Sequence, residues 1–181
     1  MNNESIKKLT VSGLLIAVGI VIPMFSPLKI ILEPASFTLA SHVAIFIALF
    51  ISPGVALSVV AGTTLGFLLG GFSPVIVLRA ASHIVFAAGG AFYLHKINSD
   101  VMSAFKLRVF SLIVALVHAL CEVIVVSVFY FGGSMNASYY QQGLLSSVFL
   151  LVGLGTVIHS MVDFEIANAI RTALKRSLKR L

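Results

Sequence analysis

The stretch FKLRVFSLIVALVHALCEVIVVSVFYF, residues 105–131, decides the fold class of this chain. A helix needs about 20 predominantly apolar residues to cross the hydrocarbon core of a bilayer. This stretch exceeds that length, and its interior carries only one acid, Glu122, and one histidine, His118. It therefore predicts a transmembrane helix with polar groups held inside the membrane.

The composition extends this prediction to the whole chain. Of the 181 residues, 59% are hydrophobic and 10% are charged, whereas soluble domains are about half apolar and about a quarter charged. A soluble fold would lack the polar surface to cover itself, which excludes soluble enzymes. The net charge of +6 comes mainly from bases that flank apolar runs, as in membrane proteins. No nucleic-acid partner is expected.

Other parts of the chain contain further candidate spans. Apolar runs lie at residues 9–25, 37–51, 55–69, 75–94 and 144–169. Together with residues 105–131 they predict an all-α integral membrane protein, a bundle of six transmembrane helices. Short breaks rich in glycine and proline separate several of the runs. We expect one domain, residues 1–181.

The distribution of lysine and arginine predicts the orientation. With six spans, the side of the two termini carries ten of these bases and the other side carries only Lys29. We therefore expect a multi-pass protein of the bacterial cytoplasmic membrane with both termini on the cytoplasmic side. The tail, about residues 166–181, has a basic amphipathic helical pattern, and we expect it to lie against anionic membrane lipid. Docking to a partner is the alternative.

Ionisable side chains inside the predicted helices carry the functional signal, because each costs about 2.5–3.5 kcal/mol or more at the centre of a membrane helix. Six of them form three pairs at i, i+4 spacing, so the members of a pair share a helix face, and a seventh lies in the second helix. They are Arg79 and His83, His118 and Glu122, His159 and Asp163, and His42. We expect these faces to point into the bundle.

The rise of about 1.5 Å per residue predicts the depth of these groups. Arg79, His83, Glu122 and His42 fall in the outer half of the membrane, and His118 falls nearer its middle. The pair His159 and Asp163 falls near the cytoplasmic end. The sequence therefore predicts an outer polar cluster and a separate inner pair. We expect the inner pair to orient its helix. His42 is either a packing histidine or a ligand contact.

The outer cluster is predicted to bind a ligand. Arg79 offers a planar fork of donors that suits a carboxylate or a phosphate. His83, His118 and Glu122 offer further hydrogen bonds. An Arg79–Glu122 ion pair that only joins two helices is the alternative, and both roles can coexist.

The predicted external loop at residues 132–143 adds Asn136 and Tyr139 near this cluster. We expect them to cover a small-molecule pocket, with ordinary interfacial tyrosines as the alternative. No HExxH or His-x-His motif occurs, so neither a metal nor a cofactor is predicted. The chain lacks a Gly-x-Ser-x-Gly turn, and we expect no enzymatic activity. In the first helix, Gly13 and Ala17 form a small-xxx-small pair of the kind that lets another helix approach closely.

The stretches PASFTLASH (34–42), FISP (50–53) and LRAASH (78–83) resemble the substrate-binding S component of energy-coupling factor (ECF) vitamin transporters, of the pantothenate or niacin type. The resemblance covers nearly the whole chain. It implies a subunit of an ABC-type importer that captures a vitamin from outside and docks on a transmembrane coupling subunit driven by two ATPase subunits. Gly13 and Ala17 would face the coupling subunit, although the family usually has alanine at the position of Gly13. The chain itself has no GxxxxGK[ST] phosphate loop.

Within this resemblance, the buried Arg79 favours an anionic vitamin. We expect pantothenate first, because its hydroxyls and amide suit the histidines and Asn136, and niacin second. The lack of tryptophan weakens the case for flat ligands such as thiamine or its precursor hydroxymethylpyrimidine. An autonomous transporter that couples to protons through its histidines and acids is the competing interpretation. A purely structural membrane subunit is the third.

Overall fold

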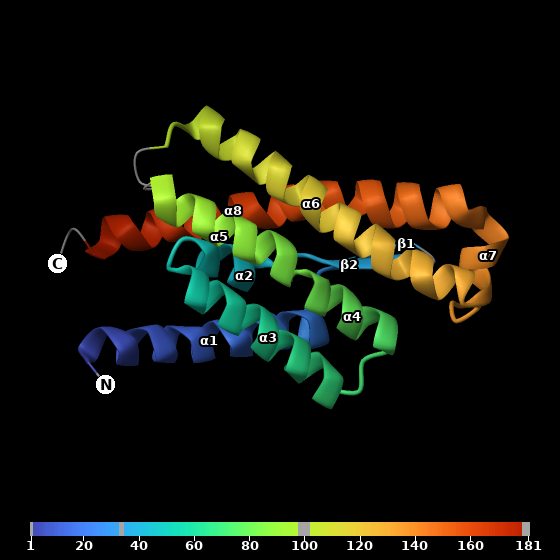
Figure 1. Cartoon of the computed structure of the whole chain (residues 1–181), viewed down its shortest axis with the longest axis horizontal. Coiled ribbons are helices and arrows are strands. Elements are labelled where there is room, and N and C mark those ends of the chain that lie inside the picture. The colour runs from blue at the N-terminus through green and yellow to red at the C-terminus, as the bar shows by residue number, and fades with distance from the viewer. Residues whose placement is uncertain (1, 33–34, 98–101, 179–181) are drawn as a thin grey trace.

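A computed structural model describes residues 2–32, 35–97 and 102–178 of the chain. The fold is mainly helical, with one β-hairpin near its centre (Figure 1). Its elements are α1 (Asn3–Phe25), β1 (Lys29–Leu32), β2 (Ala35–Thr38), α2 (Val43–Leu49), α3 (Pro53–Leu69), α4 (Pro74–Ser82), α5 (Ile84–Ile97), α6 (Ala104–Phe131), α7 (Ala137–Leu144), the π-helical segment η2 (Leu145–Leu154) and α8 (Gly155–Leu178).

Within these ranges, four helical runs are long and apolar enough to cross a membrane. They are Asn3–Phe25, Pro74–Ile97, Ala104–Phe131 and Ala137–Ser177. The apolar helix α3 is shorter, at 17 residues. The start of α1 and the end of α8 lie at the same end of the molecule (Figure 1), as an even number of passes requires.

The predicted helix at 37–51 is wrong over its first part. Residues 29–32 and 35–38 form two antiparallel strands of a hairpin, in which Lys29 pairs with Thr38 and Leu32 with Ala35. Only Val43–Leu49 is α-helical, because Ala40 takes a left-handed conformation with φ of 67° and turns the chain before α2. This segment is therefore a hairpin strand, a turn and a helix of 7 residues. Glu33 and Pro34 lie outside the described residues.

The predicted helices at 75–94 and 144–169 also differ in detail. The first is divided into α4 and α5 at His83, where the Ser82 hydroxyl donates a hydrogen bond of 2.7 Å to the Arg79 carbonyl and competes with the helical ladder. The second continues from the π-helical η2 into α8, and α7 precedes it inside the predicted loop at 132–143. The amphipathic tail is part of α8 as far as Leu178, and residues 179–181 lie outside the described range.

The buried core lies between α2, α3, α5, α6 and α8. Phe46 is its centre, with ring centroids 5.7 Å from Phe86 and 5.4 Å from Phe164. The ring of Phe86 in turn lies 4.7 Å from the ring of His118. The aromatic core thus packs directly against the buried histidine His118.

Helix α1 packs closely on α3 through glycines. A Cβ added at Gly62 would lie 2.5 Å from Ile16 of α1, and one added at Gly66 would meet Ile20. The small residues of α3 therefore serve contact within the chain. Gly13 and Ala17 of α1 are exposed, and a Cβ on Gly13 would meet nothing within 4 Å.

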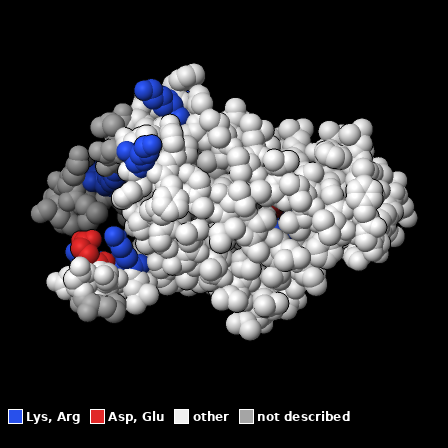
Figure 2. All heavy atoms as spheres, viewed as in Figure 1, with Lys and Arg blue, Asp and Glu red and all other residues white. Residues whose placement is uncertain are grey.

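Charge is concentrated at one end of the molecule. On the face drawn in Figure 2, lysine and arginine gather at the end where α1 begins and α8 ends, and most of the remaining face carries none. The basic residues near those helix ends include Lys7 and Lys8 in α1, Lys96 in α5, Lys106 in α6 and Lys175 in α8.

Candidate functional site

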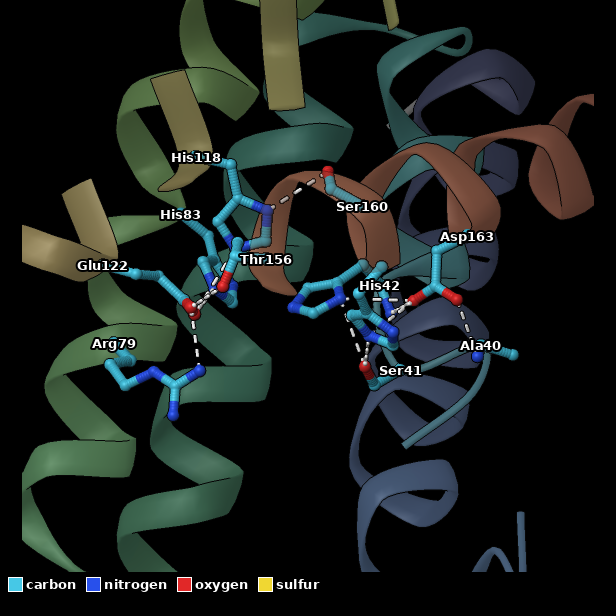
Figure 3. Close-up of polar contacts among 11 residues, drawn as sticks. Ala40, Ser41, His42, Arg79, His83, His118, Glu122, Thr156, Ser160 and Asp163 are labelled. Atoms are coloured by element: carbon cyan, nitrogen blue, oxygen red, sulfur yellow. Dashed lines mark hydrogen bonds and ion pairs between the residues drawn. The ribbon is translucent and has the colours of Figure 1, made fainter. Parts of the chain in front are cut away.

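Glu122 is the centre of a buried polar group that joins three helices (Figure 3). Its Oε2 accepts a hydrogen bond of 2.8 Å from Nη2 of Arg79 in α4 and one of 2.7 Å from the hydroxyl of Thr156 in α8. Its Oε1 lies 3.4 Å from Nε2 of His83. The Glu122 side chain is 4% exposed and that of Arg79 is 20% exposed. The carboxylate is thus satisfied within the protein, while Arg79 borders open space.

His118 stands directly behind Glu122, one helical turn earlier in α6. Its Nδ1 lies 3.3 Å from the hydroxyl of Ser160, and its Nε2 lies 3.4 Å from Oε1 of Glu122. The second contact lacks hydrogen-bond geometry, so Nε2 has no hydrogen-bond partner among the described residues. The ring is fully buried.

Asp163 is the centre of a second polar group. Its Oδ1 accepts a hydrogen bond of 2.8 Å from the backbone N–H of Ala40, and its Oδ2 accepts one of 2.9 Å from the backbone N–H of His42. Nδ1 of His42 lies 3.2 Å and Nε2 of His159 lies 3.3 Å from the same Oδ2. The Ser41 hydroxyl links the two rings, at 3.1 Å from His42 and 3.0 Å from His159. Asp163 thereby fixes the turn that follows the hairpin.

His42 joins the two groups into one site, so the prediction of a separate inner pair is wrong. The His42 ring centroid lies 4.7 Å from His118, 4.9 Å from His83 and 5.1 Å from His159. The depth estimate failed because the last helical run is 41 residues long, from Ala137 to Ser177, which places His159 near its middle. The turn after the hairpin brings His42 to the same level.

A cavity of about 180 Å³ opens beside these groups. Four of the predicted site residues line it: Arg79, His83, Glu122 and His42. His118 is not among the lining residues, since it lies behind Glu122. Lys29 and Phe37 of the hairpin and Thr63 of α3 complete part of the wall.

Asn136 and Tyr139 are not among the residues that line the cavity. Asn136 is exposed and precedes α7, without a side-chain capping hydrogen bond. Tyr139 is buried and packs with Val126 and Val152 in a separate apolar cluster. The structure therefore gives neither residue a place in the cavity wall.

Several polar residues that line the cavity were not predicted as site residues, among them Ser41 and Thr156, and His159 was expected only to orient its helix. Thr156 had a readable signal, because it shares one face of α8 with His159 and Asp163 at helical spacing. Ser41 had none, because its place depends on the turn that Asp163 holds 122 residues later in the chain.

Comparison with known proteins identifies the family. The niacin transporter NiaX of Lactococcus lactis subsp. cremoris (strain MG1363) is 40% identical to this chain over 172 residues, which cover 95% of this chain and 76% of that protein. No protein-family profile and no solved structure matches the chain. The similarity and the long apolar helices together make this a multi-pass cell membrane protein. The chain belongs to the family of the niacin transporter NiaX.

Proposed function

We propose that this chain is the substrate-capture subunit of an ECF-type importer and that it binds niacin, as nicotinate, in the cavity beside Arg79. The observation that carries the proposal is the buried Arg79–Glu122 pair, 2.8 Å apart, in the wall of a small cavity. A relative named as a niacin transporter supports the choice of vitamin.

The size of the cavity favours niacin over pantothenate, the vitamin ranked first by the sequence. Pockets for drug-sized ligands measure about 300–1,000 Å³, and this cavity measures about 180 Å³. A single pyridine ring with a carboxylate fits such a volume better than the extended chain of pantothenate. The rings of Phe37 and His159, 5.6 Å apart at the cavity wall, offer an aromatic surface for the pyridine.

Arg79 retains donors for the vitamin carboxylate. It gives an Nη2 hydrogen to Glu122, and its side chain remains 20% exposed beside the cavity, so further guanidinium hydrogens can reach a ligand. Glu122 holds the guanidinium in place and balances its charge before the ligand arrives. The hydroxyls of Ser41 and Thr156 and the ring of His159 also line the cavity, and one of them would meet the ring nitrogen.

The proposed orientation places both termini in the cytoplasm. The basic end of the molecule, where α1 begins and α8 ends (Figures 1 and 2), would face inward according to the positive-inside rule. Six passes result if β2, the turn after it and α2 together form one pass and α3 forms the next. The cavity would then open toward the outside through the hairpin residues Lys29 and Phe37.

Helix α1 is the proposed docking face for the coupling subunit. Only 17% of the residues in its most apolar stretch are buried within this chain. Gly13 and Ala17 lie exposed on it, with open space at Gly13 for an approaching helix. ATP hydrolysis would take place in the two ATPase partners.

Vesicle uptake tests the proposal. Vesicles that contain this chain, the coupling subunit and the ATPases should accumulate labelled nicotinate when ATP is supplied, and vesicles with the chain alone should not. Replacement of Arg79 by Lys, which keeps the charge but loses the planar fork, should abolish uptake. The matched control is Arg108→Lys, because the Arg108 side chain is 71% exposed. Accumulation by the chain alone under a proton gradient would contradict the importer and support an autonomous transporter.

A further inference from the structure

We propose that His42, His83, His118 and Glu122 form a binding site for a divalent transition-metal ion, best suited to Zn²⁺, in the wall between the cavity and the aromatic core. One ligand atom from each of these four residues can be chosen so that all lie within 4.8 Å of one another. They come from three different segments: the turn after the hairpin, the α4–α5 junction and α6. This inference does not depend on the identity of the vitamin.

The distances already approach those of a coordination sphere. In a tetrahedral zinc site with metal–ligand distances of about 2.0–2.1 Å, neighbouring ligand atoms lie about 3.3 Å apart. Nε2 of His83 and Nε2 of His118 each lie 3.4 Å from Oε1 of Glu122. A small inward movement of His42 would complete a set of three imidazoles and one carboxylate.

The three histidine rings meet edge to face around one point. The His83 and His118 centroids lie 4.6 Å apart at an interplanar angle of 84°, and His42 meets the two rings at 72° and 69°. Each ring thus stands nearly perpendicular to the other two. Three imidazoles that converge on one metal ion from different directions adopt similar arrangements.

The far nitrogens of two rings are already held. Nδ1 of His42 lies 3.2 Å from the carboxylate of Asp163, and Nδ1 of His118 lies 3.3 Å from the hydroxyl of Ser160 (Figure 3). Histidines that bind metals almost always bond their second nitrogen to such a group, which fixes the ring and the tautomer. This arrangement leaves Nε2 of each ring as the metal-binding atom.

Nε2 of His118 supplies an independent indication. It is buried and has no hydrogen-bond partner among the residues that the structure describes. A buried polar atom without a partner is unfavourable, and a metal ion would satisfy it. The alternative group of His42, His159 and Asp163 supplies no such indication. The Asp163 carboxylate already accepts two backbone N–H groups, and Nε2 of His159 already contacts the Ser41 hydroxyl.

The charge around the site also suits a cation. Glu122 would bind the ion directly, and Asp163 would support it through His42. Imidazole nitrogens with one carboxylate select zinc-like ions over Mg²⁺ and Ca²⁺, which prefer oxygen ligands. Arg79 would keep a positive charge at the cavity beside the ion, so an anionic ligand would still be attracted.

A cobalt titration tests this inference. The full chain is purified in detergent, its affinity tag is removed, bound metal is stripped with a chelator, and Co²⁺ is added without any vitamin. We expect a single equivalent to bind with the visible absorption of tetrahedral cobalt, Zn²⁺ to displace it, and Mg²⁺ to have no effect. Failure of the wild-type chain to bind Co²⁺ at a single equivalent would overturn the proposal, whatever the variants do.

Four variants locate the ion. His118→Gln and His83→Gln should each weaken cobalt binding by about ten-fold or more. His95→Gln, at an exposed histidine of α5, should leave it unchanged. Binding that survives both His118→Gln and His83→Gln would overturn the assignment, as would a loss confined to His159→Gln, which would place the ion in the alternative group.

Discussion

The carboxylate of Asp163 accepts a hydrogen bond of 2.8 Å from the backbone N–H of Ala40, although the two residues lie 123 positions apart in the chain. Ala40 has a φ of 67°, in the left-handed region that costs a residue with a Cβ about 1–2 kcal/mol. The interaction therefore offsets local strain, and it sets the turn that carries Ser41 and His42 into the cavity wall.

Replacement of Asp163 by Asn should lower both stability and ligand affinity. The amide would present an NH₂ group to at least one of the backbone donors of Ala40 and His42, and a buried donor left unpaired costs about 1–3 kcal/mol. Thermal unfolding in detergent should show a drop of several degrees. The control is Glu165→Gln in the same helix, where the side chain is 52% exposed. If the Asp163→Asn protein is as stable as wild type, the carboxylate does not stabilise the turn at Ala40 and His42.

Replacement of Ala40 by Gly should have the opposite effect on stability. Glycine adopts positive φ without steric cost, which outweighs its greater freedom in the unfolded chain. We expect Ala40→Gly to unfold at the same temperature as wild type or higher, and Ala40→Val to unfold lower. A marked loss of stability in Ala40→Gly would show that the turn does not depend on this conformation.

A double-mutant cycle separates the two roles of the Arg79–Glu122 pair. Removal of one partner of a buried ion pair costs about 3–5 kcal/mol, because the other charge is left uncompensated. Arg79→Met and Glu122→Gln should each destabilise the chain, and the double variant should lose less stability than the sum of both. Both variants that lack Arg79 should fail to bind nicotinate. Additive losses of stability would indicate that the two side chains do not interact.

Gly66 of α3, which packs against α1, and Gly13, on the exposed face of α1, distinguish packing within the chain from docking on a partner. Gly66→Val should destabilise the isolated chain, because the new side chain would collide with Ile20. Gly13→Val should leave stability and nicotinate affinity unchanged, because the space beside Gly13 is open. If α1 docks on the coupling subunit, Gly13→Val should still reduce ATP-driven uptake. Normal uptake by Gly13→Val would exclude this part of α1 from the interface.

The sequence predicted the long helices well where their apolar runs were continuous. Residues 105–131 were expected as one helix, and α6 spans Ala104–Phe131. The apolar run at 37–51 was wrongly predicted to be helical throughout, because a short apolar segment does not distinguish a strand from a helix. The turn at Ala40 is held by a hydrogen bond to Asp163, a contact between segments far apart in the chain that no local pattern records.

The candidate site was predictable in composition but not in extent. The i, i+4 spacing placed Arg79 with His83 and His118 with Glu122, and the Arg79–Glu122 ion pair, which the sequence offered as the alternative role, is present in the structure. The division by depth failed, since the sequence did not reveal that the last helical run extends from Ala137 to Ser177. No sequence motif indicates the proposed metal site, because its four residues come from three segments that lie far apart in the chain.

The cavity beside Arg79 is proposed to bind an anionic vitamin with a single ring. Calorimetric titration of the purified chain with nicotinate, nicotinamide and pantothenate tests it most directly, because nicotinamide keeps the ring and loses the charge. We expect tight binding of nicotinate, much weaker binding of nicotinamide and no binding of pantothenate. Binding of pantothenate in preference to nicotinate, or equal binding of nicotinate and nicotinamide, would contradict it.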